Sequence, residues 1–165
     1  MKKIRNVFLL PAVLALTVSC DEVRGYDDYD PGQTPTVTMN GEWFIDIVDQ
    51  GSGDVLAEHV LHKTYDAGFG NGQMYIDDEQ NGYYIKGLVN TDLNNLTFYT
   101  SGVENLADPG STFNITDGKI LKNAARSRDG NVVDSIYFRA EFSYDPGTTI
   151  IFSGHKRTGF LEDEY

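Results

Sequence analysis

Closely spaced turn signals constrain this chain more than any other feature, because they leave room only for short elements between them. From Gly41 onward, glycine, proline, asparagine and aspartate meet in clusters that favour tight reversals. These clusters are Gly51-Ser52-Gly53-Asp54, Asn81-Gly82, Asp108-Pro109-Gly110, Asp117-Gly118, Asp129-Gly130-Asn131 and Asp145-Pro146-Gly147. The pattern predicts a series of short strands joined by hairpins.

The runs between these turns have the composition of β-strands. Valine, isoleucine, threonine, tyrosine and phenylalanine dominate them, as they do on half-buried pleated surfaces. The alternation is clearest near the C-terminus, where one face collects the apolar side chains Ile136, Phe138, Ala140 and Phe142. We predict strands over residues 42–48, 55–65, 72–78, 83–89, 95–100, 112–115, 118–126, 132–143, 148–153 and 156–161.

An all-β chain with so many consecutive strands must either close its sheet or protect the edges. Because hairpins join most neighbours, we expect an antiparallel up-and-down β-barrel of about eight strands. A barrel of that size has an interior wide enough for side chains or for one small ligand. A two-sheet sandwich is the competing architecture, but it usually needs longer crossing connections.

The N-terminus has the order of a secretory signal, with basic residues, an apolar run and a small residue before a cysteine. The apolar run at 7–18 is shorter than the roughly 20 residues that span a bilayer. Ser19 precedes Cys20, which is the one cysteine of the chain. Such a cysteine can carry lipid, and two or three acyl chains anchor a protein stably. We therefore predict a signal peptide over 1–19 and lipid attachment at Cys20.

The stretch after the cysteine is rich in glycine, proline, aspartate and threonine and poor in aliphatic residues. This composition predicts a flexible acidic tether over residues 20–39, followed by a β-barrel domain over residues 40–165. The membrane, reached through the N-terminal lipid anchor, is then the first expected partner of the protein.

Acidic residues dominate the charge of the chain. There are 25 acidic and 13 basic residues, which gives a formal net charge of −12 at pH 7. Such a surface repels nucleic acid and anionic headgroups, and the sequence has no basic patch with interleaved aromatic residues. We therefore expect no nucleic-acid partner.

Segments at both ends of the chain carry a resemblance to a known family. Gly41-Glu42-Trp43 matches the Gly-x-Trp signature that opens the first strand of lipocalin-type barrels. Arg157-Thr158-Gly159-Phe160 lies in the closing segment, and Leu16–Cys20 resembles a bacterial lipobox. With the predicted strand at 117–125, these segments make the chain similar, over about residues 40–161, to the lipid-binding putative hydrolases of the Bacteroidota.

The resemblance implies a lipocalin-like barrel on a lipid anchor. In lipocalin-type barrels an arginine of the last strand packs across the tryptophan, so Trp43 and Arg157 would close one end of the barrel. A guanidinium over an indole contributes roughly 0.5–2 kcal/mol. The acidic stretch 21–30 also resembles the signal that sends lipoproteins of that phylum to the outer face of the outer membrane. The implied location is the outer membrane, with the domain exposed at the cell surface.

The residues themselves do not support a hydrolase. The sequence has no Gly-x-Ser-x-Gly nucleophile elbow, and Cys20 is assigned to lipid. His59 and His62 lie three apart on a predicted strand, so they point to opposite faces unless a bulge intervenes. His155 falls in a predicted turn, and the acidic run at 77–79 is predicted to be a solvated hairpin tip. We therefore predict no catalytic residue, no metal site and no cofactor.

We expect the barrel to bind a small hydrophobic ligand, a lipid or a fatty acid, since ligand sites of this kind are mostly apolar. On segment 83–89 an alternative inward set is Tyr84 and Leu88. A filled interior is the other possibility, and it would favour an envelope protein or a glycan as partner; a hydrolase is the weaker alternative. The candidate inward residues are Ile45, Ile47, Tyr83, Ile85, Val89, Ile136, Phe138 and Phe142.

Overall fold

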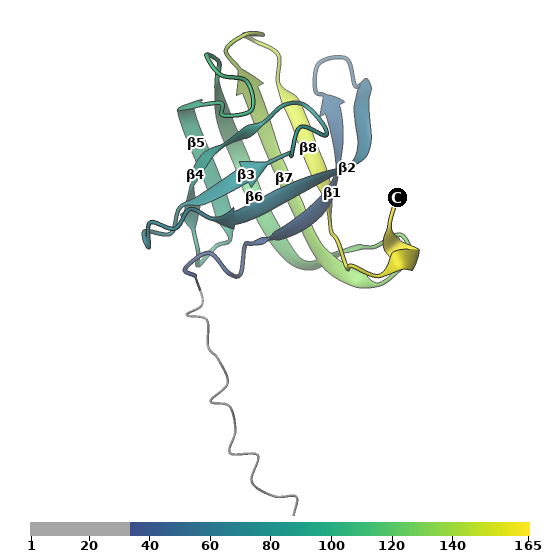
Figure 1. The fold of residues 1–165 in the computed structure, drawn as a ribbon. Coiled ribbons are helices and arrows are strands. Elements are labelled where there is room, and N and C mark those ends of the chain that lie inside the picture. Colours follow the sequence, from purple (N-terminus) through teal and green to yellow (C-terminus); the bar gives the residue numbers. More distant parts are fainter. Residues whose placement is uncertain (1–33) are drawn as a thin grey trace, which may run out of the picture. The chain divides into compact units, whose positions relative to one another are not determined.

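Eight antiparallel strands form a closed barrel in the computed structural model, which describes residues 34–165 (Figure 1). Each strand pairs with the next one along the chain, and the last strand pairs with the first. The predicted up-and-down barrel is confirmed, and the two-sheet sandwich is wrong. The strands are β1 (Gly41–Asp49), β2 (Val55–Asp66), β3 (Met74–Asp77), β4 (Lys86–Asp92), β5 (Thr97–Glu104), β6 (Thr112–Arg126), β7 (Val132–Phe142) and β8 (Ile150–Lys156).

The predicted signal peptide over 1–19, the lipid-attachment residue Cys20 and most of the predicted tether lie outside the described residues. After the barrel, the chain forms the short 3-10 helix η2 (Leu161–Asp163). The described part of the chain contains no helix with the length and apolar character needed to cross a membrane.

The last residues of the predicted tether range, 34–39, form turns that pack against the barrel. Thr36 and Met39 are fully buried. The Thr36 hydroxyl donates a hydrogen bond to Asp66 Oδ2 at 2.8 Å, and the Met39 carbonyl accepts one from the Thr64 hydroxyl at 2.7 Å. The compact domain therefore begins at Thr34.

One predicted turn lies inside a strand. Asp117-Gly118 forms a bulge, and β6 continues through it as a single strand that replaces the two predicted ones. Asp117 has a φ of 55°, and the pairing with β7 shifts between Thr116 and Lys119. A bulge and a tight turn can both use a residue with positive φ, so the same dipeptide suits either.

Other boundaries also differ from prediction. β8 runs unbroken through His155, which is therefore not in a turn, and it ends at Lys156. The rest of the predicted strand at 156–161 is the irregular connection to η2 and its first residue. β4 begins at Lys86, because residues 83–85 belong to the preceding loop.

Large side chains fill the interior of the barrel. The rings of Phe138 and Phe152 stack with their centroids 4.5 Å apart, and Phe98 packs 5.7 Å from Phe138. The aromatic side chains Trp43, Phe98, Phe113, Phe138 and Phe152 each expose at most 1% of their surface. Side chains so inaccessible to water pack against one another and not around an open chamber.

Trp43 is buried at the end of β1 where the barrel begins, as predicted, but a different cation covers it. Lys156 lies opposite Trp43 in the β1–β8 pairing, and its Nζ is 5.8 Å from the centre of the Trp43 ring system. Arg157, the next residue, instead forms ion pairs with Glu42 at 2.6 Å and Glu164 at 2.7 Å. The structure thus places the ammonium group of Lys156 over the indole, in place of the Arg157 guanidinium that the resemblance implies.

Closure of the barrel requires a glycine at the β1–β8 seam. Gly154 of β8 lies opposite Ile45 of β1. A Cβ atom at position 154 would lie 2.0 Å from the carbonyl oxygen of Phe44, which belongs to the β1 backbone. That oxygen cannot move away without disrupting the ladder that closes the barrel, so the close approach excludes any side chain.

We predict that Gly154→Ala lowers the free energy of unfolding by about 3 kcal/mol or more, because the added methyl group must separate two paired backbones. Urea unfolding measures the change. The control is Ser153→Ala on the same strand, for which we expect a change within about 0.5 kcal/mol. Equal effects of the two substitutions would show that the seam tolerates a side chain.

A buried carboxylate fastens the C-terminal segment to the β6–β7 hairpin. Oδ1 of Asp163 accepts a hydrogen bond from the Asp129 N–H at 2.6 Å. Oδ2 accepts from Asn131 Nδ2 at 3.0 Å and from the Thr158 hydroxyl at 2.7 Å. Burial by itself raises the pKa of Asp163, but the hydrogen bonds outweigh it and hold that pKa well below its ordinary value.

We predict that Asp163→Asn lowers the melting temperature at neutral pH. The pKa of Asp163 is lower in the folded than in the unfolded state, so the ionised carboxylate stabilises the fold fully above the unfolded pKa of about 3.9, and this stabilisation is lost as the pH falls below that value. The difference in melting temperature between the wild type and the variant should therefore decrease between pH 5 and pH 2.5. The control is Glu162→Gln at the exposed neighbouring position, for which a constant, small gap is expected.

Candidate functional site

The hairpin end of the barrel is the end where the β1–β2, β3–β4, β5–β6 and β7–β8 loops meet (Figure 1). The β3–β4 loop, residues 78–85, is here called the cap segment. Asp78 and Ile85 at its two ends are fully buried, and the Asp78 N–H donates to the Ile85 carbonyl at 3.0 Å. A Cβ at Gly82 would lie 3.2 Å from Cε1 of His62, so the cap backbone rests directly on interior side chains.

Aromatic rings form a column from this end into the core. Tyr83 of the cap segment lies 5.2 Å from Phe142 and 6.4 Å from Phe152, measured between ring centroids. Phe152 stacks on Phe138 in the interior, and Tyr144 stacks on Phe142 at 5.2 Å on the outside. The column therefore joins the filled core to the surface without interruption.

An open cleft of about 450 Å³ lies at the outer end of the column. Asn105 is fully buried and stabilises the cleft, because its Nδ2 donates to the Tyr84 carbonyl at 2.7 Å. The side chains of Tyr84 and Tyr144 are 55% and 49% exposed. The cleft is lined by residues from the β3–β4, β5–β6 and β7–β8 loops: Tyr84, Ala107, Asp108 and Tyr144.

The hairpin end is electrostatically negative. Burial raises the pKa of Tyr144 to about 12, and the charges of Asp108 and Asp145 add to the effect. Burial and then the charge of Asp145 also raise the pKa of Tyr83. Both phenols are therefore neutral hydrogen-bond donors at neutral pH, and the surrounding carboxylates disfavour an anionic group in the cleft.

Two polar side chains are buried beneath the cap segment. His62 and Asp78 are both fully buried. Lys63 of β2 pairs with Asp77 at the end of β3. One residue beyond this last pair, the same antiparallel alignment would bring His62 opposite Asp78, with both side chains turned inward. Nδ1 of His62 lies 3.1 Å from the Val60 carbonyl oxygen. Within residues 34–165, Nε2 of His62 and Oδ2 of Asp78 have no hydrogen-bond partner.

The prediction of a solvated tip at 77–79 is wrong for its first two residues. Asp78 is fully buried and Asp77 is 7% exposed, while Glu79 lies at the surface. Asp77 forms an ion pair with Lys86 at 2.7 Å. The reason is that the turn at 78–81, in which the Asn81 N–H donates to the Asp78 carbonyl at 2.8 Å, is not the tip of the hairpin. The cap segment continues to Ile85 and lies over the barrel interior, which buries Asp78.

The histidines do not come together. A bulge does intervene in β2, where His59 has a φ of 51° and the pairing with β1 shifts. His59 is nevertheless exposed and His62 buried. His155 lies on the outside of β8, where Nε2 is 3.2 Å from the hydroxyl of Tyr165. No group of three or more metal-ligating side chains forms within residues 34–165.

The structure brings the predicted interior residues into one cluster. On segment 83–89 the inward set is Tyr83, Ile85 and Val89, with Tyr83 half-buried at the hairpin end; Tyr84 points outward and Leu88 is half-buried. The remaining members expose at most 3% of their surface: Ile45, Ile47, Ile85, Val89, Ile136, Phe138 and Phe142.

Sequence reasoning missed the cleft and the buried polar pair. The signal for His62 was present, because it alternates with Val60 and Thr64 on the inward face of β2. No local signal marks Asp78, whose burial depends on the path of the cap segment. The cleft combines three loops that are distant in the sequence.

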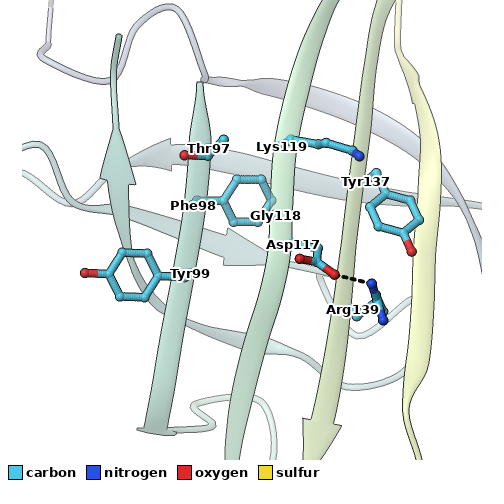
Figure 2. Close-up of a pocket in the computed structure, with 8 residues that line it drawn as sticks. All are labelled: Thr97, Phe98, Tyr99, Asp117, Gly118, Lys119, Tyr137 and Arg139. Atoms are coloured by element: carbon cyan, nitrogen blue, oxygen red, sulfur yellow. Dashed lines mark ion pairs between the residues drawn. The ribbon is translucent and has the colours of Figure 1, made fainter. Parts of the chain in front are cut away.

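A second hollow, here called the outer groove, lies on the wall of the barrel over β5, β6 and β7 (Figure 2). Its volume is about 620 Å³. Arg139 forms an ion pair with Asp117 of the bulge, and Nζ of Lys119 lies 5.0 Å from the centre of the Tyr137 ring. Tyr99 on the rim is 60% exposed. The groove thus presents aromatic rings together with charged groups.

A family model matches most of the chain. The family described as lipid-binding putative hydrolase matches residues 28–161, a range that contains every strand of the barrel. No curated protein matches the chain.

We predict that Asn105→Ala lowers the free energy of unfolding by about 1–3 kcal/mol, because it leaves buried backbone groups without partners. The groups affected are the Lys86 N–H and the Tyr84 carbonyl, at 3.1 Å and 2.7 Å from the amide. Amide hydrogen exchange should also accelerate in the cap segment. Asn94→Ala in the exposed β4–β5 loop is the control and should change neither quantity. Unchanged exchange in the cap would contradict the assigned role of Asn105.

Proposed function

Since the chain belongs to the family of lipid-binding putative hydrolases, we propose that it binds a small hydrophobic ligand, a lipid or a fatty acid, without catalysing a reaction on it. The protein acts as a lipoprotein of the cell envelope. It is anchored through Cys20 in the outer membrane and holds its barrel at the cell surface.

The observation that carries the proposal is the aromatic column that opens into the cleft at the hairpin end. The cleft volume of about 450 Å³ lies within the range of small-molecule sites, roughly 300–1,000 Å³. Apolar ligand surface buried against the rings of Tyr144 and Tyr84 contributes about 25 cal/mol per Å². Because the interior below Phe142 is filled, the ligand chain lies at the hairpin end and not along the barrel axis.

The chemistry of the hairpin end supports binding over hydrolysis. Acyl transfer to a side chain requires a nucleophile within hydrogen-bond reach of a base. His62 is the histidine buried beneath the cap segment, and its Nε2 meets no hydroxyl group at hydrogen-bond distance within residues 34–165.

A second candidate function is recognition of an envelope protein or a glycan. The outer groove favours it, because Tyr99 and Tyr137 offer ring faces beside the charged groups of Lys119 and Arg139 (Figure 2). Sugars and protein surfaces both present the mixture of apolar faces and hydroxyl or amide groups that such a surface recognises.

Native mass spectrometry of the gently purified protein, with titration of a fluorescent fatty-acid probe, tests the two functions. We expect a co-purified or added apolar molecule at a ratio of one to one. Tyr144→Ala should weaken probe binding about tenfold, which corresponds to about 1.4 kcal/mol.

The matched control is Tyr99→Ala, which removes a ring of comparable exposure from the outer groove and should leave probe binding unchanged. Loss of binding in the Tyr99 variant alone would transfer the site to the outer groove. The absence of any bound apolar molecule would reject lipid binding and leave the protein or glycan partner.

A further inference from the structure

His62 presents an unused hydrogen-bond acceptor to the barrel interior. A carbonyl oxygen can only accept, so the contact with Val60 at 3.1 Å places the ring proton on Nδ1. Burial lowers the pKa of His62, although the charges of Asp78 and Asp77 oppose the shift, and the ring is therefore neutral at neutral pH. In this tautomer Nε2 is an acceptor, and it lacks a donor among the described residues.

Asp78, at the start of the cap segment, presents a second acceptor. Its Oδ1 accepts a hydrogen bond from the Gln80 N–H at 2.9 Å. Its Oδ2 has no partner within residues 34–165. The charge of Asp78 acts on His62, so the two buried side chains lie near each other and one ligand head can engage both.

Two buried acceptors are satisfied by a ligand head that donates hydrogen bonds. A primary ammonium group carries three N–H donors, and a hydroxyl group carries one donor and can also accept. A carboxylate carries none and would place a like charge against Asp78. Unpaired buried acceptors are costly, so a site of this kind discriminates strongly between a head that donates and one that does not.

Apolar groups surround the pair on its other sides. The ring of Phe152 lies edge-on to His62 at 5.9 Å, and the side chain of Ile47 lies beneath Gly82 of the cap. The aromatic column leads from here through Tyr83 toward the cleft. Polar atoms beneath the cap, with packed aromatic rings between them and the cleft, match an amphiphile with one small head and a long chain, provided that these rings move apart on binding.

The charge at the mouth favours the same head group. Asp108 lines the cleft and Asp145 lies in the adjoining loop, and both act electrostatically on Tyr144. A concentration of negative charge attracts cations and repels carboxylates on approach. The negative charge at the surface and the buried acceptors in the interior therefore both favour a head that donates hydrogen bonds over a carboxylate.

We propose that His62 and Asp78 hold the head of the ligand, and that they select an amine or alcohol on a long apolar chain over the carboxylate of a fatty acid. The inference rests on the proposed function, because it requires that an apolar molecule binds at the hairpin end. The cap segment covers the pair, so binding displaces Tyr83 from its place against Phe142 and Phe152.

Titration of the wild-type protein with decylamine, 1-decanol and decanoate at neutral pH tests the proposal by calorimetry. These probes share one chain length and differ only in the head. We expect decylamine to bind at least about tenfold more tightly than decanoate, with 1-decanol between them. Asp78→Asn keeps an oxygen for the Gln80 N–H but replaces the free acceptor with a donor, and it should reduce the preference about tenfold.

The matched control is Asp54→Asn, which removes an equal charge from the exposed β1–β2 loop and leaves both the cleft and the buried pair intact. It should retain the preference for decylamine. Failure of all the probes to bind the wild type would reject the proposed function. Equal affinities, or a preference that Asp78→Asn leaves intact, would overturn this inference alone.

A measurement on the wild-type protein does not depend on how the variants fold. Addition of decylamine should shift the ¹⁵N resonance of His62 Nε2, because an acceptor nitrogen responds to a new donor. His59 and His155 lie outside the barrel and serve as internal controls whose resonances should stay in place. A His62 resonance that decylamine does not move would overturn the proposal.

Discussion

The backbone ladder between β1 and β8 is the constraint on which the rest of this molecule depends, because it turns a meander of hairpins into a closed barrel. Closure removes both edges of the sheet and gives all strands one shared interior. The ladder forms only because residue 154 is a glycine, which lets the two backbones approach closely. The carbonyl oxygen of Phe44 lies where the Cβ atom of any other residue at position 154 would be. The filled core, the buried tryptophan and the hairpin end all follow from that approach.

Within the closed barrel, one polar pair interrupts an otherwise apolar interior. The middle is filled by stacked aromatic rings such as Phe138 and Phe152. Beneath the cap segment, His62 and Asp78 are fully buried among these apolar side chains. A buried polar atom that lacks a partner among the described residues is unfavourable in an apolar interior, so its presence beneath the cap points to a role other than folding.

Alternation made the interior predictable strand by strand. The inward parity of Ile45, Phe138 and Phe142 follows from the two-residue period of a strand, and closure then assembles those faces into one cluster. The same rule fails at loops. The Asp117-Gly118 dipeptide is a bulge instead of a turn, and the acidic run at 77–79 is largely buried instead of solvated, because both outcomes depend on which partner strand lies alongside.

The sequence by itself therefore determined the class of fold, the approximate strand positions and the composition of the core, since these follow from local periodicity and turn chemistry. The tertiary structure alone decided that Lys156 and not Arg157 covers Trp43, that three loops line one cleft, and that His62 and Asp78 are buried near each other. These relations join residues far apart along the chain. They depend on how the strands pair and on the path of the cap segment in the folded molecule, and no local sequence pattern predicts either of these.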